Sequence, residues 1–313
     1  MPSSTSMSAR LRSWYRSNTF DHAEFTAERL AAQHDRTVSV CLPARNEAAT
    51  IGPILETLAQ LRVEGIVDQV VVVDDSTDGT AQIARDLGAD VHDQEALWPE
   101  HGPVLGKGDA MWRSLRVLRG DVVCFVDADS EQFGAHFVRG LIGPLLCEPR
   151  ISFVKGFYRR PFRIGDTTFP DGGGRVTELT ARPLLNMFYP ELAAIQQPLS
   201  GEIAARRDVL ERLPFVTGYG VDIALLIDAH ATLGLDAIAQ VDLDVRQNAH
   251  QSLRDLGPMA YAVLQAVTSR LVREGRLDAA LPTSFTAPGD DGPHTISSEP
   301  VQRPPLRSLR AAA

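Results

Sequence analysis

The stretch Asp121-Val-Val-Cys-Phe-Val-Asp-Ala-Asp129 decides which fold the sequence predicts. Its five consecutive apolar residues, 122–126, are typical of a short strand that is buried on both faces of a sheet. This strand would end in Asp127 and Asp129, whose side chains point to the same side of an extended backbone. Open α/β sheets bind ligands at the carboxyl ends of their strands, and two converging carboxylates suit Mg²⁺ or Mn²⁺. A polar turn after a strand is the simpler alternative for the same residues.

The composition of the 313 residues restricts the class of protein. A formal net charge of −9 argues against a nucleic-acid-binding surface, although a site for anionic substrates can still concentrate positive charge locally. The three cysteines lie in apolar stretches without metal-binding spacing, which favours core thiols in a reducing compartment. The sequence shows neither a signal peptide nor an apolar run long enough to span a bilayer. We therefore expect a soluble cytoplasmic protein that binds neither nucleic acid nor a membrane.

Strand and helix patterns alternate along the chain. Buried strands are predicted at 37–43, 67–73 and 90–92, and the intervening segments 51–61 and 80–87 carry the apolar spacing of helices. This alternation predicts a parallel sheet with right-handed crossovers. Further strands are predicted at 151–158 and 238–245, and further helices at 137–146, 176–188, 221–233 and 255–274. The predicted fold class is α/β, with a Rossmann-like, mainly parallel central sheet and a helical C-terminal extension.

Four segments are expected along the chain. Residues 1–13 are predicted to be disordered, and residues 14–160 form a first α/β half. Residues 161–275 form a second half that ends in the C-terminal helix. Residues 276–313 are rich in Pro, Gly, Ser and Asp, and are predicted to be a flexible tail.

Further polar residues follow the first two predicted strands, at the same edge of the sheet as Asp127 and Asp129. Carboxylates at this edge can accept hydrogen bonds from a nucleobase N–H group and from ribose hydroxyls. The residues in question are Pro43, Ala44, Glu47, Asp74, Asp75 and Ser76. The structural interpretation, in which Asn46 and Asp78 cap the two following helices, is compatible with this one because different residues are involved.

Two glycine-rich stretches are candidate anion sites. Lys107 lies between two glycines, where it either contacts a phosphate or remains an exposed loop lysine. Gly174, Arg175 and Thr177 combine backbone freedom, a guanidinium and a hydroxyl at a helix start, which favours a phosphate or carboxylate site over an ordinary loop. Neither stretch fits a Walker A motif or GxGxxG, so ATP-dependent phosphoryl transfer and dinucleotide binding lack their signatures.

Two residues beyond the last predicted strand, Asn248 and His250, could share a face of the chain. A neutral imidazole is a common metal ligand, so His250 could complete a metal shell begun by Asp129. A lone histidine is more often structural or exposed to solvent, and the residues alone leave both interpretations open.

The order of these motifs resembles that of the GT-A glycosyltransferases, which use nucleotide sugars. The shared pattern is strand–Pro-Ala-x-Asn-Glu, strand–Asp-x-Ser-Thr-Asp-x-Thr, Gly-Lys-Gly and strand–Asp-x-Asp. More specific stretches resemble the family that contains the glucosyl-3-phosphoglycerate and mannosyl-3-phosphoglycerate synthases. These stretches are 172–179, 182–186, 197–202 and 218–223, together with the pattern Trp14-x-x-x-Asn18-x-Phe20. The resemblance covers about residues 14–275.

This resemblance implies a metal-dependent, retaining hexosyltransferase. Such an enzyme would move glucose from a nucleoside-diphosphate sugar, with UDP-glucose expected, to the 2-hydroxyl of 3-phosphoglycerate. The alternative donor is GDP-mannose, which would make the protein a mannosyl-3-phosphoglycerate synthase. Residues 14–160 would bind the nucleotide sugar and residues 161–275 the acceptor. The implied cofactor is Mg²⁺ or Mn²⁺, and the implied assembly is a homodimer.

The resemblance also implies a role for each matching residue. The donor-binding residues would be Pro43, Ala44, Glu47, Asp75, Ser76, Lys107, Asp127, Ala128 and Tyr219. The phosphate and carboxylate of the acceptor would be held by Gly174, Arg175 and Thr177. The catalytic residues would be Asp129, Leu199 and Asp222. Asp129 and His250 would bind the metal, the Leu199 backbone carbonyl would lie near the acceptor hydroxyl, and Asp222 would line the sugar pocket.

Two positions depart from the family pattern. Asp222 stands where the family often has a glutamate that is one methylene longer, which leaves glucose and mannose as alternatives. An ungapped comparison places Asn248 at the family's metal-binding histidine. Because histidine is the more usual metal ligand, His250 is the first prediction and Asn248 the second.

Three other functions have less support. A polyprenyl-phosphate glycosyltransferase of the same fold would require a membrane anchor or a lipid-facing helix. A nucleotidyltransferase would require a glycine-rich motif with Arg and Lys after the first strand, where this chain has Pro43-Ala-Arg-Asn46. A non-catalytic nucleotide-sugar sensor would not require the site at 174–177.

Overall fold

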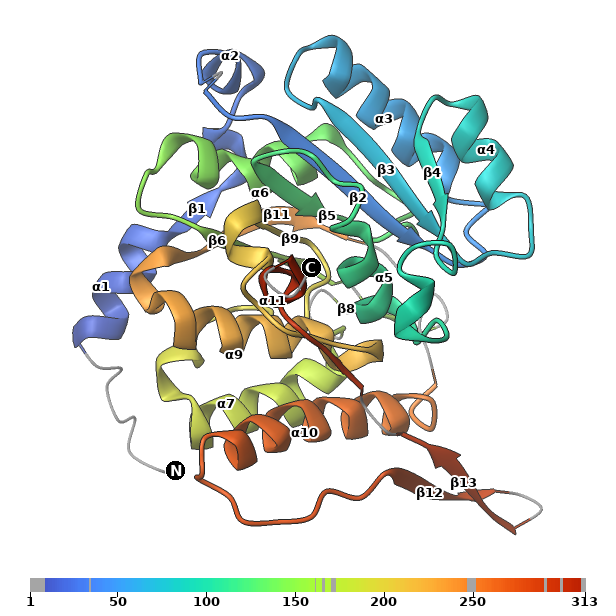
Figure 1. The fold of residues 1–313 in the computed structure, drawn as a ribbon. Coiled ribbons are helices and arrows are strands. Elements are labelled where there is room, and N and C mark those ends of the chain that lie inside the picture. Colours follow the sequence, from blue (N-terminus) through green and yellow to red (C-terminus); the bar gives the residue numbers. More distant parts are fainter. Residues whose placement is uncertain are drawn as a thin grey trace.

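The structure is a computed structural model that describes residues 9–33, 35–160, 162–164, 167–169, 173–246, 252–289, 292–298 and 301–310. An eight-stranded sheet runs through the molecule in the order β1-β11-β6-β9-β5-β2-β3-β4 (Figure 1). In that order the strands are Thr19–Asp21, Ile238–Val245, Phe153–Arg159, Ile203–Arg206, Val122–Phe125, Val38–Ala44, Gln69–Asp74 and Asp90–Asp93. Strand β9 is antiparallel to β5 and β6, and the other neighbouring pairs are parallel. The predicted α/β class is therefore confirmed.

Strand β5, from the stretch that predicted the fold, lies near the middle of this sheet between β2 and β9. All four of its residues are buried, and β3 is buried along its whole length. Strands of this kind are apolar on both sides because helices cover both faces of the sheet. Val126 lies just beyond β5 and is also buried, so that Asp127 and Asp129 emerge at the edge of the sheet.

Two helical layers enclose the sheet (Figure 1). The core on one face includes side chains from α2 (Ala27–Ala31), α3 (Ile51–Val63), α4 (Thr80–Asp86) and α6 (Ala135–Cys147). The core on the other face includes α1 (Ala9–Asn18), α5 (Lys107–Ser114), α7 (Arg182–Phe188), α8 (Arg207–Leu210), α9 (Val221–Leu233), α10 (Leu256–Arg273) and α11 (Leu306–Arg310). Helix α9 is buried from Val221 to Ala229 because it contacts both α10 and β11.

Among the described residues, three antiparallel strand pairs lie outside the main sheet. They are β7 (Phe162–Ile164) with β8 (Thr167–Phe169), β12 (Ser284–Gly289) with β13 (Gly292–Ser297), and β10 (Phe215–Val216) with β14 (Gln302–Arg303). The β12–β13 hairpin projects from the body of the molecule (Figure 1). None of the helices in the described part of the chain has the length and apolar character that a membrane crossing requires.

The structure corrects the expected N-terminal boundary. Helix α1 begins at Ala9, so residues 9–13 are helical and do not belong to a disordered segment. The helix is anchored by Trp14, whose indole N–H lies 3.0 Å from the carbonyl oxygens of both Leu235 and Ile238. The expected halves 14–160 and 161–275 also share one sheet, because β9 and β11 lie among strands of the first half.

The expected flexible tail at 276–313 is also corrected. This segment contains the β12–β13 hairpin, β14 and α11. Arg303 and Leu306 are buried against the body of the protein. The prediction failed because overall composition does not reveal single buried anchors within a Pro-rich segment.

A buried ion cluster joins α10 to α9. Asp228 of α9 accepts a hydrogen bond from Arg270 of α10 at 2.5 Å and another from Arg273. The side chains of Asp228 and Arg270 are 3% and 1% exposed.

We expect Asp228→Ala to lower the free energy of unfolding by about 3–5 kcal/mol, because Arg270 would remain buried without its carboxylate. Urea denaturation measures this change. The control is Asp208→Ala, which breaks an exposed pair with Arg212 and should cost less than about 1 kcal/mol. Similar small losses in both variants would contradict the assignment.

Candidate active site

A cleft of about 520 Å³ opens at the edge of the sheet where β2, β3 and β5 end. The predicted donor-side residues that line it are Pro43, Ala44, Glu47, Asp75, Lys107, Asp127, Ala128 and Tyr219. The predicted acceptor and catalytic residues that line it are Gly174, Arg175, Thr177, Asp129, Leu199 and Asp222. The acidic strand ends and the glycine-rich stretch therefore share one cleft, although they are far apart in the sequence.

Some predicted residues do not line this cleft. Ser76 is not among the lining residues, and its hydroxyl accepts a hydrogen bond from the backbone N–H of Asn46 at 2.8 Å. The side chain of Asn46 in turn accepts from the backbone N–H of Thr77, so the interpretation of Asn46 as a helix cap is wrong. His250 and Asn248 lie outside the described residues, and the choice between them stays a prediction.

The two carboxylates after β5 converge on one cation, which is the guanidinium of Arg246. Its Nη1 lies 3.1 Å from Asp127 Oδ2, and its Nη2 lies 2.6 Å from Asp129 Oδ1. The same guanidinium pairs with Glu202, and the Arg246 side chain is 1% exposed. Because Arg246 follows β11 and Glu202 precedes β9, the order of strands in the sheet brings these groups together.

Lys107, at the first residue of α5, is a second cation in the cleft. Its Nζ lies 2.5 Å from Asp127 Oδ1 and 3.7 Å from Asp222 Oδ2. Although burial opposes ionisation, Lys107 and Arg246 hold the pKa of Asp127 well below its usual range. Burial and the neighbouring Asp127 raise the pKa of Asp129, whose side chain is 51% exposed. The two aspartates therefore differ: Asp127 is held by cations, and Asp129 lies at the open part of the site.

Gly201 allows these charged groups to approach one another. A Cβ atom at this position would lie 2.1 Å from Lys107 Nζ and 2.5 Å from Asp127 Oδ1, so a side chain would displace the pair. Beside Gly201, the carbonyl oxygen of Ser200 accepts a hydrogen bond from the buried Lys155 Nζ at 2.6 Å. Burial lowers the pKa of Lys155 to about 8. The hydrogen bond from the buried Lys155 amine therefore holds the backbone of the connection from Leu199 to Gly201 in place.

The glycine-rich stretch 173–177 also lines the cleft. Gly174 has φ +73°, a conformation that favours glycine, and its carbonyl accepts from Glu178 N–H at 3.0 Å. The turn at Thr177–Ala181 is π-helical, a rare form that is frequent at functional sites. Arg160, the residue after β6, lines the same cleft as Arg175. Two guanidiniums, a hydroxyl and a helix start suit a small polyanion.

Sequence reasoning assigned no role to Arg246, Glu202, Lys155 or Arg160. Their positions depend on β11, β9 and β6 lying beside β5, which no local pattern reveals. The sequence did contain one signal for these residues, which is their position in or beside apolar strands. Charged residues are rarely buried in such places without a partner. That signal indicates that such residues are important but does not identify their partners.

The donor set fits a hard divalent cation. The carboxylates of Asp129 and Glu47 both line the cleft, and carboxylate oxygens are the ligands that Mg²⁺ and Mn²⁺ prefer. Burial and the charge of Asp129 raise the pKa of Glu47, so a cation between them would relieve repulsion. Within the described ranges no three His, Cys, Asp or Glu side chains form a complete metal cluster, and the predicted ligand His250 lies outside those ranges.

The buried Lys155 predicts how stability depends on pH. Its pKa falls from 10.5 in the unfolded chain to about 8 in the fold, so the unfolded chain holds the extra proton between these values. The free energy of unfolding should therefore rise with pH, by about 3 kcal/mol relative to Lys155→Met between pH 8 and 10.5. Urea denaturation of both proteins across this pH range measures the difference. A difference between the two proteins that stays constant with pH would contradict the lowered pKa of Lys155.

Similarity to known proteins places the chain in a family. Residues 39–167 match the model described as "Glycosyl transferase family 2". The chain is 44% identical over 301 residues to the glucosyl-3-phosphoglycerate synthase of Mycolicibacterium smegmatis, covering 95% of this chain and 98% of that protein. It is 43% identical over 267 residues to the enzyme of the same name from Petrotoga mobilis, covering 83% and 82%.

Solved structures of similar proteins share the fold. The mannosyl-3-phosphoglycerate synthase of Rubrobacter xylanophilus is 43% identical, with a TM-score of 0.88 over 96% of this chain and 98% of that one. The glucosyl-3-phosphoglycerate synthase of Mycobacterium tuberculosis, in complex with Mn²⁺, UDP-glucose and phosphoglyceric acid, is 43% identical, with a TM-score of 0.82 over 94% and 99%. This chain therefore belongs to the family of metal-dependent GT-A glycosyltransferases that contains the glucosyl-3-phosphoglycerate synthases.

Proposed function

We propose that this protein transfers glucose from UDP-glucose to the 2-hydroxyl of 3-phosphoglycerate, with retention of anomeric configuration. The observation that carries this proposal is the single cleft in which Asp129 and Arg175 both lie. One side suits a metal-bound diphosphate, and the other suits a small acid with a phosphate and a carboxylate. The complex of the Mycobacterium tuberculosis enzyme with Mn²⁺, UDP and glucosyl-3-phosphoglycerate supports the same assignment.

The donor would lie along the ends of β2, β3 and β5. Pro43, Ala44 and Asp75 would contact the uracil and ribose, and Glu47 and Ala128 lie in the same part of the cleft. Because Ser76 does not line the cleft, it would affect donor binding indirectly, by holding the loop at Asn46 in place. Lys107 and Arg246 would place two positive charges near the diphosphate.

A bound divalent cation would act as a Lewis acid that neutralises charge on the departing diphosphate. Asp129 would hold it, with His250 as the proposed further ligand. Arg175, Thr177 and Gly174 would orient the acceptor so that its hydroxyl meets the anomeric carbon, which is mainly an effect of proximity. The backbone carbonyl of Leu199 would lie near that hydroxyl.

Retention leaves two routes for the transfer. In front-face attack, an oxygen of the leaving phosphate takes the proton of the acceptor hydroxyl. A covalent sugar–enzyme intermediate would instead need a carboxylate below the anomeric carbon, and Asp222 is the candidate. Its Oδ1 is buried without a hydrogen-bond partner among the described residues, which favours the binding of sugar hydroxyls. Tyr219 would line the same pocket, with its pKa raised by burial to about 12.

A second candidate function is mannosyl transfer from GDP-mannose. The similarity to the mannosyl-3-phosphoglycerate synthase of Rubrobacter xylanophilus favours it. Asp222, which is shorter than glutamate by one methylene, is the residue that we expect to discriminate between the two sugars.

We also propose that the protein is a cytoplasmic homodimer. The free cysteines, two of them buried, are consistent with a reducing compartment, and the projecting β12–β13 hairpin is available for contact with a second copy (Figure 1). Light scattering of the purified protein tests the dimer, and a monomeric mass would contradict it.

The proposed reaction is tested with purified protein, 3-phosphoglycerate and either UDP-glucose or GDP-mannose, with and without Mg²⁺. We expect metal-dependent formation of glucosyl-3-phosphoglycerate, with the α-configuration of the donor visible in the ¹H NMR coupling of the anomeric proton. Transfer of mannose alone would favour the second candidate function. A β-linked product would contradict retention, and no product from either donor would contradict the proposed function.

Replacing the proposed metal ligand should abolish most activity. We expect Asp129→Ala to lower kcat at least about a hundredfold, corresponding to about 2.7 kcal/mol, because the leaving diphosphate would lose its metal. Thermal unfolding should change little, since the buried Arg246 keeps Asp127 and Glu202 as partners. Asp86→Ala, on the exposed part of α4, is the control that should retain full activity. Full turnover by Asp129→Ala would exclude the metal assignment.

Replacing the proposed acceptor arginine should affect only one substrate. We expect Arg175→Ala to raise the KM for 3-phosphoglycerate about tenfold or more and to leave the KM for UDP-glucose within about twofold. Arg159→Ala removes a nearby exposed arginine and should leave both KM values unchanged. Initial-rate kinetics measure these constants, and equal increases in both KM values would rule out the acceptor site.

A further inference from the structure

The C-terminal segment returns to the wall of the cleft. Strand β14 pairs antiparallel with β10. One residue further, Thr217 donates its N–H to the Val301 carbonyl at 2.9 Å, and Val301 donates its N–H to the Thr217 hydroxyl at 3.1 Å. Residues 301–304, here called the strap, are therefore bonded to backbone two residues before Tyr219, which lines the cleft.

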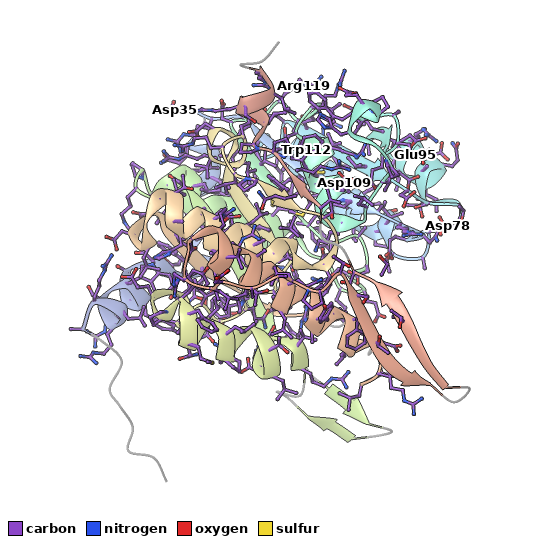
Figure 2. All side chains as sticks on the ribbon, turned by 60° about the horizontal axis from the view of Figure 1, so that its bottom comes forward. Asp35, Asp78, Glu95, Asp109, Trp112 and Arg119 are labelled. Atoms are coloured by element: carbon purple, nitrogen blue, oxygen red, sulfur yellow. The ribbon has the colours of Figure 1, made fainter. Side chains whose placement is uncertain are left out.

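On its other side the strap is bonded to α5. Arg303 donates to both carboxylate oxygens of Asp109, from Nε at 2.7 Å and from Nη2 at 3.0 Å. The two side chains are 6% and 0% exposed. The indole N–H of Trp112 donates to the Pro304 carbonyl at 2.8 Å, and Figure 2 labels Asp109 and Trp112. Since Asp109 is two residues after Lys107, the strap is tied to the start of the helix that carries the lysine.

The same cluster holds the loop that leads into α5. Asp109 also accepts from Arg113 Nε at 3.0 Å and from the backbone N–H of Leu105 at 3.0 Å. Arg303 Nη1 donates to the carbonyl of His101 at 2.5 Å. The cluster thus has one carboxylate and two guanidiniums. Removal of Arg303 would leave a neutral buried pair, and not an isolated buried charge, so we expect such a variant to fold.

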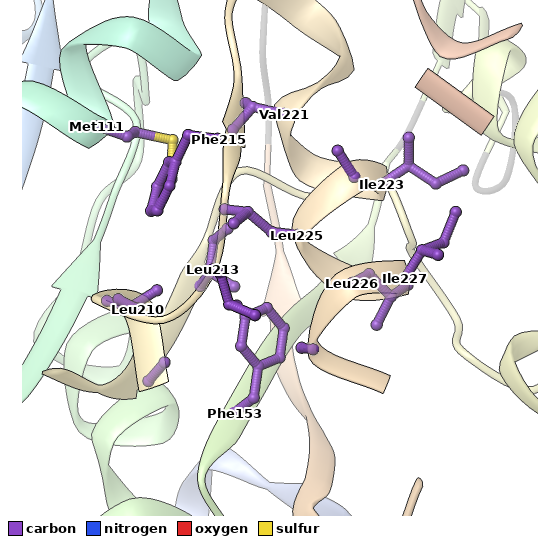
Figure 3. Packing of buried hydrophobic residues seen from close by; sticks show 14 of the residues in the cluster. Met111, Phe153, Leu210, Leu213, Phe215, Val221, Ile223, Leu225, Leu226 and Ile227 are labelled. Carbon is purple, nitrogen blue, oxygen red and sulfur yellow. The ribbon is translucent and has the colours of Figure 1, made fainter. Parts of the chain in front are cut away.

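The two elements that the strap joins are in direct contact with each other. A Cβ atom on Gly108 of α5 would lie 1.9 Å from the carbonyl oxygen of Val216 in β10, so no side chain fits between them. In the core behind this contact, Met111 of α5 lies beside Phe215 of β10 (Figure 3). Helix α5 and strand β10 are therefore in close contact, and the strap is bonded to both.

We propose that the strap, through Arg303, sets the positions of Lys107 and Asp222 for the sugar nucleotide. Lys107 begins α5, and Asp222 is the second residue of α9, which follows the turn after β10. Their 3.7 Å ion pair connects α5 to α9, the helix that follows β10 in the chain. Arg303 does not line the cleft, so it is a positioning residue for donor binding. The inference rests on the proposed function.

The test compares the full-length protein with Arg303→Ala, Arg303→Lys and the control Arg307→Ala, whose side chain is exposed on α11. We expect Arg303→Ala to raise the KM for UDP-glucose about tenfold and to leave the KM for 3-phosphoglycerate within about twofold. Arg303→Lys keeps the charge but not the paired hydrogen bonds, so its donor KM should lie between those of wild type and Arg303→Ala. Arg307→Ala should match wild type.

A purely structural role would instead lower thermal stability without separating the two KM values. An unchanged donor KM in Arg303→Ala, or equal increases in both KM values, would overturn the inference. If Arg303→Ala does not fold, Trp112→Phe removes the hydrogen bond to Pro304 together with part of the buried ring, while Arg303 keeps its bonds to Asp109. It should raise the donor KM about threefold, and an unchanged value would overturn the inference in that case. Absence of turnover in wild type would instead show that the proposed function had failed, and the inference with it.

Discussion

The site depends on the neutralisation of buried charge around the Arg246 guanidinium. Arg246 and Glu202 are almost fully buried, and such a pair is stable only when each charge has close partners. Asp127 and Asp129 supply further partners for the same guanidinium. The strand order of the sheet is what makes this arrangement possible, because β11, β9 and β5 end or begin at the same place. The polar groups of the cleft are thereby fixed before any substrate arrives.

The glycine-rich part of the cleft is built from different groups. Gly174 supplies backbone freedom before the π-helical turn, while Arg175 and Arg160 supply positive charge. Acidic residues that suit a metal and basic residues that suit an anion therefore line one cleft. Transfer between a nucleotide sugar and a phosphorylated acid requires such a combination. The strap adds a further constraint, because it joins the start of α5 to the chain that precedes Tyr219.

Local sequence patterns predicted those features of the structure that depend on residues close together in the chain. The apolar run before Asp127 gave a central strand, and the polar residues after neighbouring strands were expected at one edge. Lys107 and Arg175 were recognised because glycines beside a cation are a local signal. Arg246 was missed because its partners come from distant strands. The tail was mispredicted because the contact between Arg303 and Asp109 joins residues 194 positions apart.

The central claim is that the metal-bound diphosphate and the acceptor lie in one cleft. Paramagnetic relaxation of ³¹P nuclei by Mn²⁺ tests it most directly, with protein, UDP and 3-phosphoglycerate together in solution. The account predicts faster relaxation of both the UDP and the 3-phosphoglycerate phosphorus in wild type, with the effect on 3-phosphoglycerate lost in Arg175→Ala. Protein-dependent relaxation of UDP alone, with 3-phosphoglycerate unaffected in wild type, would contradict a shared cleft.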